Sequence, residues 1–498
     1  MERLSTGIAG LDEVMRGGLL ARSMHLVIGA PGTGKTVLAQ QLAFHHARRG
    51  SNVIFLTALS ESVEGLIAHA ENLNFFDPGL VAQRLFYVSV FSELQAGGLS
   101  SVLDEIRRMV IQYRAEVVLL DGLHTLKLAS GDPLDFRRFV FTANTQLRSL
   151  GTTSIFLTVD DSLKQADPEA TVADGIILLH QDTLSGRGGR FIEVPKLRTV
   201  PHLLGQNSFV ITDDGLTVFP RLEAVAAAEG LPTIGVARER LDTGIPTLNQ
   251  MAGGGLPSGS VTVVCGAHGA GKTLLGLSFL VEGARRGEAG LYLGLQEAPP
   301  RLIAQGDNVG LELSRWVQSG LVHLKWQPML EPLADELAWR LIAAARARSA
   351  TRVVIDGFDD LLHSIRYPER ILGFAHALTN TLRGLGVTTI LTMLFPFTDD
   401  PSASPGVTTE PACLLRSEPA LALSTPRNMV CTAADNIVLL RYVRVEAHLR
   451  RLVSILKMRE NEYDSTTYEF AISSSGLQVT KPFDIGCPRS SWRPTGQS

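Results

Sequence analysis

The same glycine-rich motif occurs twice in this chain, once in each half. Residues 29–36 read Gly-Ala-Pro-Gly-Thr-Gly-Lys-Thr, and residues 266–273 read Gly-Ala-His-Gly-Ala-Gly-Lys-Thr. Each copy follows an apolar run and precedes a helical pattern. The spacing is that of a P-loop, in which glycines let backbone N–H groups face phosphate oxygens and the next helix directs its positive end at them. The sequence therefore predicts two nucleotide sites, and the second copy makes a chance glycine-rich turn a poor explanation.

The residue types in each motif fit Mg·ATP. The lysine would reach the β- and γ-phosphates, and the threonine hydroxyl group would bind Mg²⁺. An aspartate that ends an apolar run in each half occupies the Walker B position, which holds the magnesium shell. The predicted cofactor-binding residues are Gly29, Gly32, Thr33, Gly34, Lys35, Thr36 and Asp121, with Gly266, Gly269, Ala270, Gly271, Lys272, Thr273 and Asp356; the predicted magnesium residues among them are Thr36, Asp121, Thr273 and Asp356.

The duplication extends over both halves of the chain. The segment Arg3–Ile8 returns as Arg240–Ile245, a shift of 237 residues, whereas the Lys-Leu-Arg at 196–198 returns as Lys-Met-Arg at 457–459, a shift of 261. The second half therefore carries a net insertion, which the proline-rich stretch 396–427 accounts for. We expect a first domain at 1–229, a linker within 224–236, a second domain at 230–481 and a disordered tail at 482–498.

Within each half, short apolar runs alternate with helical patterns. Runs at 53–56, 117–120 and 154–157 alternate with helical stretches at 103–113 and 136–150. This order predicts an α/β fold with a mainly parallel sheet. The runs at 176–179, 191–197 and 209–219 surround glycine-rich turns, which predicts an antiparallel edge.

Composition excludes several classes of protein. The net charge is −4, so no global basic field favours nucleic acid. The four cysteines show no metal-ligand spacing, and Cys265 lies in an apolar run, where we expect it to be packed. No signal peptide and no apolar run of membrane-spanning length is present. We therefore expect a cytoplasmic protein that binds neither membrane nor nucleic acid.

Hydrolysis of ATP needs a carboxylate that activates water at the end of the second strand. Glu61 and Glu297 occupy that place in the two halves. The alternative is an acidic residue that simply stabilises the first turn of a helix. We favour the catalytic interpretation, because each half has one carboxylate where the mechanism requires it.

Two pairs of cations occur at matched positions near the end of each half. These residues are Lys196, Arg198, Lys457 and Arg459. They could be solvated charges on a strand, or they could stabilise transition-state charge across a subunit interface, as an arginine finger does. Their repetition at one shift favours the catalytic role.

Together these motifs resemble the KaiC family of tandem RecA-type ATPases over nearly the whole chain. The resemblance implies two RecA-like P-loop domains, homohexameric rings with ATP between neighbouring protomers, slow ATPase activity in the first domain and autokinase plus autophosphatase activity in the second. It also implies a partner of the KaiB type or another signalling protein. The chain departs from the family pattern at two places. One of the paired glutamates is replaced in each half, by Ser60 or Gln296, and one of the adjacent phosphoacceptors is Cys431, which leaves Thr432 as the candidate.

Three hypotheses follow for function. The first is an ATP hydrolase that also phosphorylates itself on Thr432 and acts in signalling or circadian-type regulation. The second is a nucleotide-gated scaffold with little turnover, which the replaced glutamates favour. The third is a DNA-dependent ATPase of the RecA or DnaB type, which the acidic balance of the chain does not support. Against phosphorylation of Thr432, Thr171 occupies the matching place in the first half, so a threonine there could be only a strand-forming residue.

Overall fold

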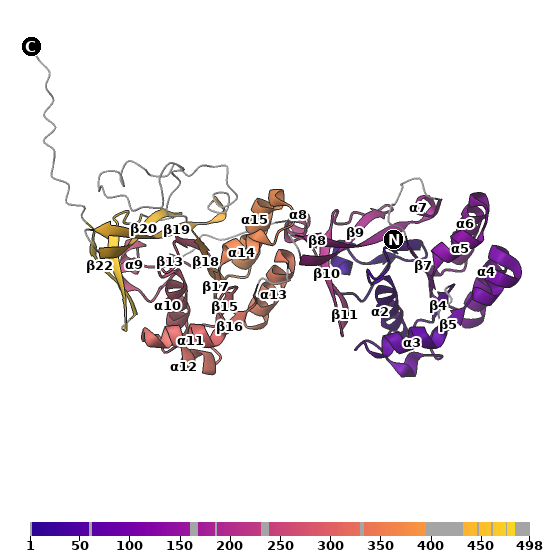
Figure 1. The fold of residues 1–498 in the computed structure, drawn as a ribbon, viewed down its shortest axis with the longest axis horizontal. Helices are drawn as coiled ribbons and strands as arrows, with labels where there is room; N and C mark the ends of the chain where they lie inside the picture. Colours follow the sequence, from indigo (N-terminus) through magenta and orange to yellow (C-terminus); the bar gives the residue numbers. More distant parts are fainter. Residues whose placement is uncertain are drawn as a thin grey trace, which may run out of the picture. The chain divides into compact units, whose positions relative to one another are not determined.

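The chain forms two compact units, Met1–Glu229 and Gly230–Ser498, and each is described by itself (Figure 1). The computed structural model describes residues 2–58, 62–159, 168–184, 187–230, 239–328, 333–394, 432–445, 448–459, 462–474 and 476–483. Within these ranges, no helix has both the length and the apolar character needed to cross a membrane.

The first unit is built on one sheet, in which the described part of the chain contributes nine strands in the order β11-β10-β9-β8-β3-β7-β6-β4-β5. The strands from β8 to β5 are parallel, and β9, β10 and β11 extend the sheet in antiparallel fashion. The elements are β1 (Arg3–Leu4), α1 (Leu11–Val14), β2 (Leu19–Leu20), β3 (Met24–Gly29), α2 (Lys35–Arg48), β4 (Val53–Thr57), α3 (Val63–Glu71), η1 (Pro78–Leu80), β5 (Leu85–Ser89), α4 (Phe91–Tyr113), β6 (Val117–Asp121), α5 (Leu123–Ala129), α6 (Pro133–Ser149), β7 (Thr153–Thr158), α7 (Pro168–Val172), β8 (Gly175–Leu184), β9 (Arg187–Leu197), β10 (Asn207–Thr212), β11 (Gly215–Phe219) and α8 (Leu222–Glu229).

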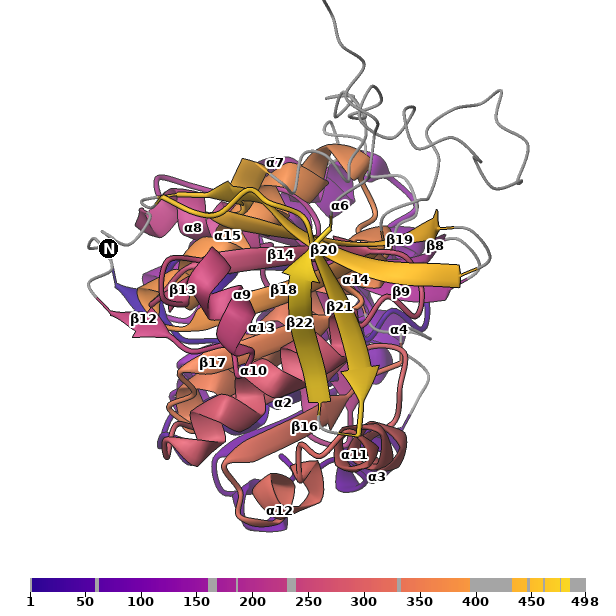
Figure 2. The same cartoon turned by 90° about the vertical axis from the view of Figure 1, so that its left-hand side faces the viewer.

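The second unit repeats this topology, with the order β16-β15-β17-β18-β14-β19-β20-β21-β22. Its strands from β16 to β19 are parallel, and β20, β21 and β22 form the antiparallel edge that faces the viewer in Figure 2. The elements are β12 (Arg240–Leu241), α9 (Pro246–Met251), β13 (Leu256–Pro257), β14 (Val261–Gly266), α10 (Lys272–Arg285), β15 (Gly290–Gly294), α11 (Pro299–Asn308), α12 (Leu313–Gln318), β16 (Val322–Trp326), α13 (Ala334–Ala347), β17 (Arg352–Asp356), α14 (Phe358–His363), η2 (Pro368–Arg370), α15 (Ile371–Gly384), β18 (Thr388–Leu394), β19 (Asn436–Val445), β20 (His448–Met458), β21 (Tyr468–Ser473) and β22 (Gly476–Pro482).

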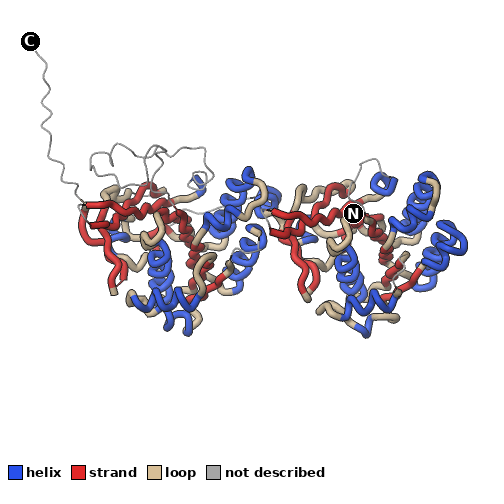
Figure 3. The backbone as a smooth tube through the Cα atoms, viewed as in Figure 1, coloured by secondary structure: helices blue, strands red, loops and turns tan. Residues whose placement is uncertain are grey.

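Each unit is a layered α/β fold, with strands at the centre and helices outside (Figure 3). Parallel strands read as continuous apolar runs because helices cover both faces of the sheet. Every residue of β3 is buried, and so is every residue of β14. In the first unit, Leu26 and Ile28 of β3 pack in one core with residues of α4, α5 and α6. The predicted fold class, two tandem RecA-like domains with a mainly parallel sheet and an antiparallel edge, is confirmed. Cys265 is buried in β14, as expected.

Four local expectations differ from the structure. The run at 209–219 is a hairpin, because Asp213, Asp214 and the positive φ of Gly215 form a turn between β10 and β11. Helix α4 begins well before residue 103 and is kinked at Gly98, whose φ is 64°. The alanine-rich start of the expected linker is helix α8, consistent with the high helix propensity of alanine. At the other end of the chain, β22 includes Pro482, the first residue of the expected tail.

Some predictions fall on residues outside the described part. These are Glu61 and Ser60, the proline-rich stretch 396–427 with Cys431, the end of the linker at 231–236 and most of the tail, 484–498.

Candidate functional site

The first P-loop connects β3 to α2, and its glycines lie in positions that disfavour other residues. A Cβ atom on Gly29 would lie 2.6 Å from the carbonyl oxygen of Leu179 on the neighbouring strand. Gly34 precedes the first residue of α2 with a φ of 102°, a conformation that L side chains rarely adopt. Gly32 also has a positive φ, and a Cβ there would meet nothing, so this part of the loop is open. Thr33 holds the loop together by donating a hydrogen bond of 2.8 Å to the carbonyl oxygen of Ala30.

Lys35 is folded back over this loop. Its ammonium group donates to the carbonyl oxygens of Gly29, at 2.7 Å, and Ala30, at 2.9 Å. The side chain is only 7% exposed. A phosphate in the loop would offer the same ammonium group an anionic acceptor, and hydrogen bonds between charged groups are stronger than those to a carbonyl.

The second P-loop has the same geometry. Lys272 donates to the carbonyl oxygens of Gly266 and Ala267, both at 2.8 Å. Burial lowers the pKa of Lys272, while the nearby carboxylates of Asp356 and Asp359 act in the opposite direction. Gly271 has a φ of 102°, the same value as Gly34, so both P-loops lead into their helices with the same backbone conformation at this glycine. Of the remaining loop residues, Gly269 has a positive φ and Ala270 is buried.

The Walker B aspartates end the strands β6 and β17 and face the P-loop threonines. The hydroxyl group of Thr36 donates to Oδ2 of Asp121 at 2.9 Å, and that of Thr273 donates to Oδ2 of Asp356 at 2.7 Å. In each case a hydroxyl oxygen and a carboxylate lie side by side at the mouth of the loop. Such a pair suits Mg²⁺, which prefers oxygen ligands and completes its shell with phosphate oxygens and water. Within the described ranges, no three His, Cys, Asp or Glu side chains are grouped so that they could hold a metal ion by themselves.

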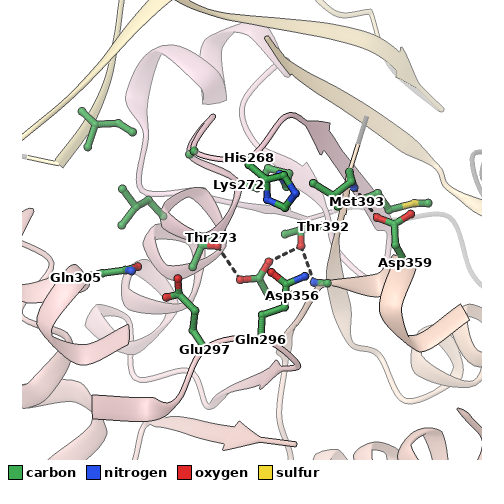
Figure 4. Close-up of a pocket in the computed structure, with 16 residues that line it drawn as sticks. His268, Lys272, Thr273, Gln296, Glu297, Gln305, Asp356, Asp359, Thr392 and Met393 are labelled. Atoms are coloured by element: carbon green, nitrogen blue, oxygen red, sulfur yellow. Dashed lines mark hydrogen bonds between the residues drawn. The ribbon is translucent and has the colours of Figure 1, made fainter. Parts of the chain in front are cut away.

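A cavity of about 240 Å³ lies in front of the second P-loop (Figure 4). The P-loop, the ends of β15, β17 and β18, and β21 contribute to its walls. Figure 4 shows Lys272, Thr273, Glu297, Asp356 and Thr392 around it. Positively charged and acidic groups thus converge on one concave space, as a site for a phosphorylated ligand requires.

Sequence reasoning missed two residues at this site, Tyr292 and Thr392. Both donate hydrogen bonds to the carboxylate of Asp356, Tyr292 at 2.5 Å to Oδ2 and Thr392 to Oδ1. Burial, followed by the charge of Asp356, raises the pKa of Tyr292 well above its ordinary value, so its hydroxyl group keeps its proton and donates. A tyrosine and a threonine in apolar strands carry no motif. Only the sheet register brings them to Asp356.

The carboxylate of Glu297 is turned toward Thr273 (Figure 4). Its Oε2 atom is buried and makes no hydrogen bond within the described part of the chain. The neighbouring Gln296 does not share this position, because its amide group donates to Oδ2 of Asp360 at 2.7 Å. Glu297 is thus the carboxylate available to a water molecule in the cavity, while Gln296 is engaged in holding the loop. Glu61, its counterpart, lies outside the described residues.

The predicted cation pairs lie near the amino ends of the parallel strands, whereas the P-loops lie at the carboxyl ends. Leu197 of β9 pairs with Gly175 of β8, which pairs with His25 near the start of β3. The P-loop follows the far end of β3, four residues or about 13 Å further along the strand. Lys196 and Arg198 therefore do not face the P-loop of their own unit. In the second unit, Met458 of β20 pairs with Asn436, which pairs with Thr262 near the start of β14, so Lys457 and Arg459 are placed alike.

In the first unit, these cations bind the segment of the chain that precedes β8, the strand beside β9. Lys196 donates to the carbonyl oxygens of Ala170, at 2.8 Å, and Thr171, at 3.3 Å, and Arg198 donates to that of Thr171 at 2.9 Å. Burial, followed by the charge of Arg198, lowers the pKa of Lys196. Arg198 lies one residue beyond the end of β9, so the expectation that both cations lie on the strand is wrong for Arg198.

The second unit repeats the arrangement next to Thr432. Lys457 donates to the carbonyl oxygen of Ala434 at 2.7 Å, and Arg459, one residue beyond β20, lies 3.6 Å from Asp435. Thr432 is exposed. Asp435, three residues later, accepts a hydrogen bond of 2.9 Å from the N–H of Val261 at the start of β14. Thr432 precedes the start of β19 and therefore lies toward the end of the parallel strands that is remote from its own P-loop.

Comparisons with known proteins agree with this geometry. The family model described as "ATPase: KaiC" matches residues 4–223 and 241–483. The chain is similar to the circadian clock oscillator protein KaiC of Picosynechococcus sp., with 26% identity over 97% of this chain and 90% of that protein. It is also 26% identical to circadian clock oscillator protein KaiC 1 of Synechocystis sp. over 97% of this chain and 90% of that protein, and to the KaiC of Rippkaea orientalis over 97% and 89%.

Proposed function

Because the chain belongs to the KaiC family of ATPases, we propose that both of its P-loops bind Mg·ATP, in domains 1–229 and 230–481, and that it hydrolyses ATP slowly. One observation carries this proposal. In each unit a P-loop lysine is folded over the loop, and a threonine hydroxyl group donates to a Walker B carboxylate. These three groups, the lysine, the threonine hydroxyl and the carboxylate, are the ones that hold phosphate and magnesium in P-loop enzymes.

The residues of the second site have separate roles in this proposal. The backbone N–H groups and Lys272 would hold the phosphates, and Thr273 with Asp356 would hold Mg²⁺, which neutralises charge on the transferring phosphoryl group. Glu297 would accept a proton from the attacking water. Gln296, which is bound to Asp360, offers no second carboxylate beside Glu297 for this step, and this supports a slow rate.

We also propose a homohexameric ring, which the position of the cations supports. Lys457 and Arg459 lie at the end of the strands that is remote from the P-loop of their own unit, so they would meet a nucleotide held by a neighbouring chain. There they would stabilise charge as an arginine finger does. Lys196 and Arg198 would do the same for the first site.

The same argument applies to autophosphorylation of Thr432. The exposed threonine shortly precedes Ala434 and Asp435, which Lys457 and Arg459 contact, and a neighbour's second-site ATP would arrive at this end of the strands. Glu297 of that neighbour could position the hydroxyl group for in-line attack. We therefore propose transfer between chains, not within one chain.

The names of the relatives extend the proposal to signalling or circadian-type regulation in the cytoplasm. A protein of the KaiB type or another signalling partner would then respond to the nucleotide state of the ring. A second candidate is a nucleotide-gated scaffold with little turnover, and the engagement of Gln296 supports it.

Turnover by the purified full-length chain tests the proposal and separates it from the alternatives. We expect release of phosphate that requires Mg²⁺, is abolished when both Lys35 and Lys272 are replaced by alanine, and is unchanged by single-stranded DNA. Nucleotide binding without turnover would identify a scaffold. Stimulation by single-stranded DNA would identify a DNA-dependent ATPase.

A further inference from the structure

In the second site, side chains hold both oxygens of the Walker B carboxylate. Three hydroxyl groups bind the carboxylate of Asp356: Thr273 at 2.7 Å and Tyr292 at 2.5 Å on Oδ2, and Thr392 on Oδ1. Thr392 also accepts a hydrogen bond of 2.9 Å from the N–H of Gly357, the residue after the aspartate. Both oxygens of Asp356 are therefore fixed, and so is the turn that follows.

The register of the sheet explains these contacts. Strands β15 and β18 flank β17. Gly294 pairs with Asp356, so Tyr292, two residues earlier on the same face of β15, reaches the carboxylate on the diagonal. On the other side Ile355 pairs with Leu391, which places Thr392 directly beside Asp356.

The first site has no hydroxyl group at these two places, but it has one at a third, because Thr57 stands where the second site has Gly294. Thr57 pairs with Asp121, and the residue two positions earlier is Phe55. On the other side of β6, Asp121 pairs with Leu157. Phe55 and Leu157 are fully buried, and Tyr292 and Thr392 are almost fully buried. The units thus share a backbone and a P-loop but differ in the neighbours of the Walker B carboxylate.

We propose that Tyr292 and Thr392 are positioning residues that orient Asp356 for Mg²⁺ and thereby strengthen metal binding at the second site. This inference rests on the proposed Mg·ATP site. With Oδ2 held toward Thr273, the carboxylate does not have to reorient when the metal arrives. Outer-shell partners of metal ligands act in this way, and their loss typically lowers metal affinity about 10- to 100-fold.

The test uses the full-length chain carrying Lys35→Ala, so that a fluorescent ATP analogue, mant-ATP, reports on the second site alone. Tyr292→Phe and Thr392→Val each remove one hydroxyl group. We expect each to raise the Mg²⁺ concentration for half-maximal retention of mant-ATP about tenfold, while mant-ATP affinity in EDTA stays within twofold. In electron paramagnetic resonance the signal of free Mn²⁺ decreases as the metal binds, so the measurement reports metal binding directly. The Mn²⁺ concentration for half-maximal binding should rise by the same factor.

Two controls remove buried hydroxyl groups that have no hydrogen-bond partner in the described structure. These are Tyr87→Phe in the first unit and Thr389→Val on β18. Neither should change the Mg²⁺ requirement. An unchanged requirement in Tyr292→Phe and Thr392→Val, or an equal change in the controls, would overturn the inference.

Binding of mant-ATP in the Lys35→Ala chain also tests the ATP site on which the inference rests. If the Lys35→Ala chain binds no mant-ATP with or without Mg²⁺, the ATP site itself is refuted and the inference falls with it.

Discussion

Thr36 and Asp121 are 85 positions apart in the chain, yet the hydroxyl group of Thr36 donates to Oδ2 of Asp121 at 2.9 Å. Thr273 and Asp356, 83 positions apart, form the same bond at 2.7 Å. Parallel strands bring their carboxyl ends to one edge of a sheet, so a helix start and a strand end meet there. Each pair marks a place where a metal-bound phosphate would be held.

Replacing the P-loop lysines one at a time should empty the sites one at a time. Lys35→Ala should reduce nucleotide bound per chain from two to one, and Lys272→Ala should do the same for the other site. Loss of charged hydrogen bonds to phosphate should weaken binding about 10- to 100-fold. Equilibrium binding with radiolabelled ATP measures the stoichiometry, and the exposed Lys481→Ala is the control. Two nucleotides still bound by the double variant would refute both sites.

Assembly should depend on ATP and on the cations at the sheet edge. Size-exclusion chromatography with light scattering should show a hexamer with saturating Mg·ATP, because a ligand that binds only the assembled state stabilises it. Arg459→Ala, which removes a half-exposed guanidinium group, should weaken the ring, whereas the exposed Arg49→Ala should not. A chain that stays monomeric at micromolar concentration with saturating ATP would argue against the ring.

Thr432 should take up phosphate from a neighbouring chain. Incubation with labelled ATP and peptide mapping should find label that Thr432→Ala removes and Thr171→Ala leaves in place. A mixture sharpens the test: Lys272→Ala chains keep the acceptor, and Thr432→Ala chains keep the second-site ATP. Label on the Lys272→Ala chains would show transfer between chains. Label that survives Thr432→Ala unchanged, or none while ATP is bound, would favour the scaffold.

Glu297 should set the rate of hydrolysis at the second site. In the Lys35→Ala background, Glu297→Gln should lower kcat about 100-fold and leave ATP affinity unchanged, because general bases contribute about 10²- to 10⁴-fold. Gln296→Glu adds a second carboxylate and should raise kcat. Phosphate release measures both, and Glu282→Gln, far along α10, is the control. A normal rate in Glu297→Gln would assign this residue to the helix start only.

Arg352 should be important for the stability of the second unit. Its side chain is fully buried, pairs with Glu288 at 2.5 Å and donates to the carbonyl oxygens of Asp242 and Phe279. Glu288→Gln leaves the buried guanidinium ion without its counter-charge and should lower the free energy of unfolding by about 3 kcal/mol. Tryptophan fluorescence measures this unit selectively, because all four tryptophans lie after residue 230. Glu312→Gln, in an exposed ion pair, should change stability by less than about 1 kcal/mol, and an equal loss in both variants would contradict the prediction.

The sequence by itself determined the class of fold, the duplication and the family. The P-loop is a local structure whose glycines, lysine and threonine are adjacent in the chain, so its spacing could be recognised directly. Alternating apolar runs and helical patterns determined the α/β class, because a buried parallel strand needs apolar residues on both faces. Local turn chemistry was harder to recognise, and the hairpin at Gly215 was missed within one apolar run.

Only the tertiary structure decided what surrounds Asp356 and where the cations lie. Tyr292 and Thr392 reach that carboxylate from two strands that are neighbours in the sheet but not in the chain, and their spacing carries no periodic signal. In the same way, β9 and β20 run antiparallel to β8 and β19. The cations at the ends of β9 and β20 therefore lie at the end of the parallel strands opposite the P-loop. Strand order and register result from packing the whole sheet, and a pattern read along the chain does not contain them.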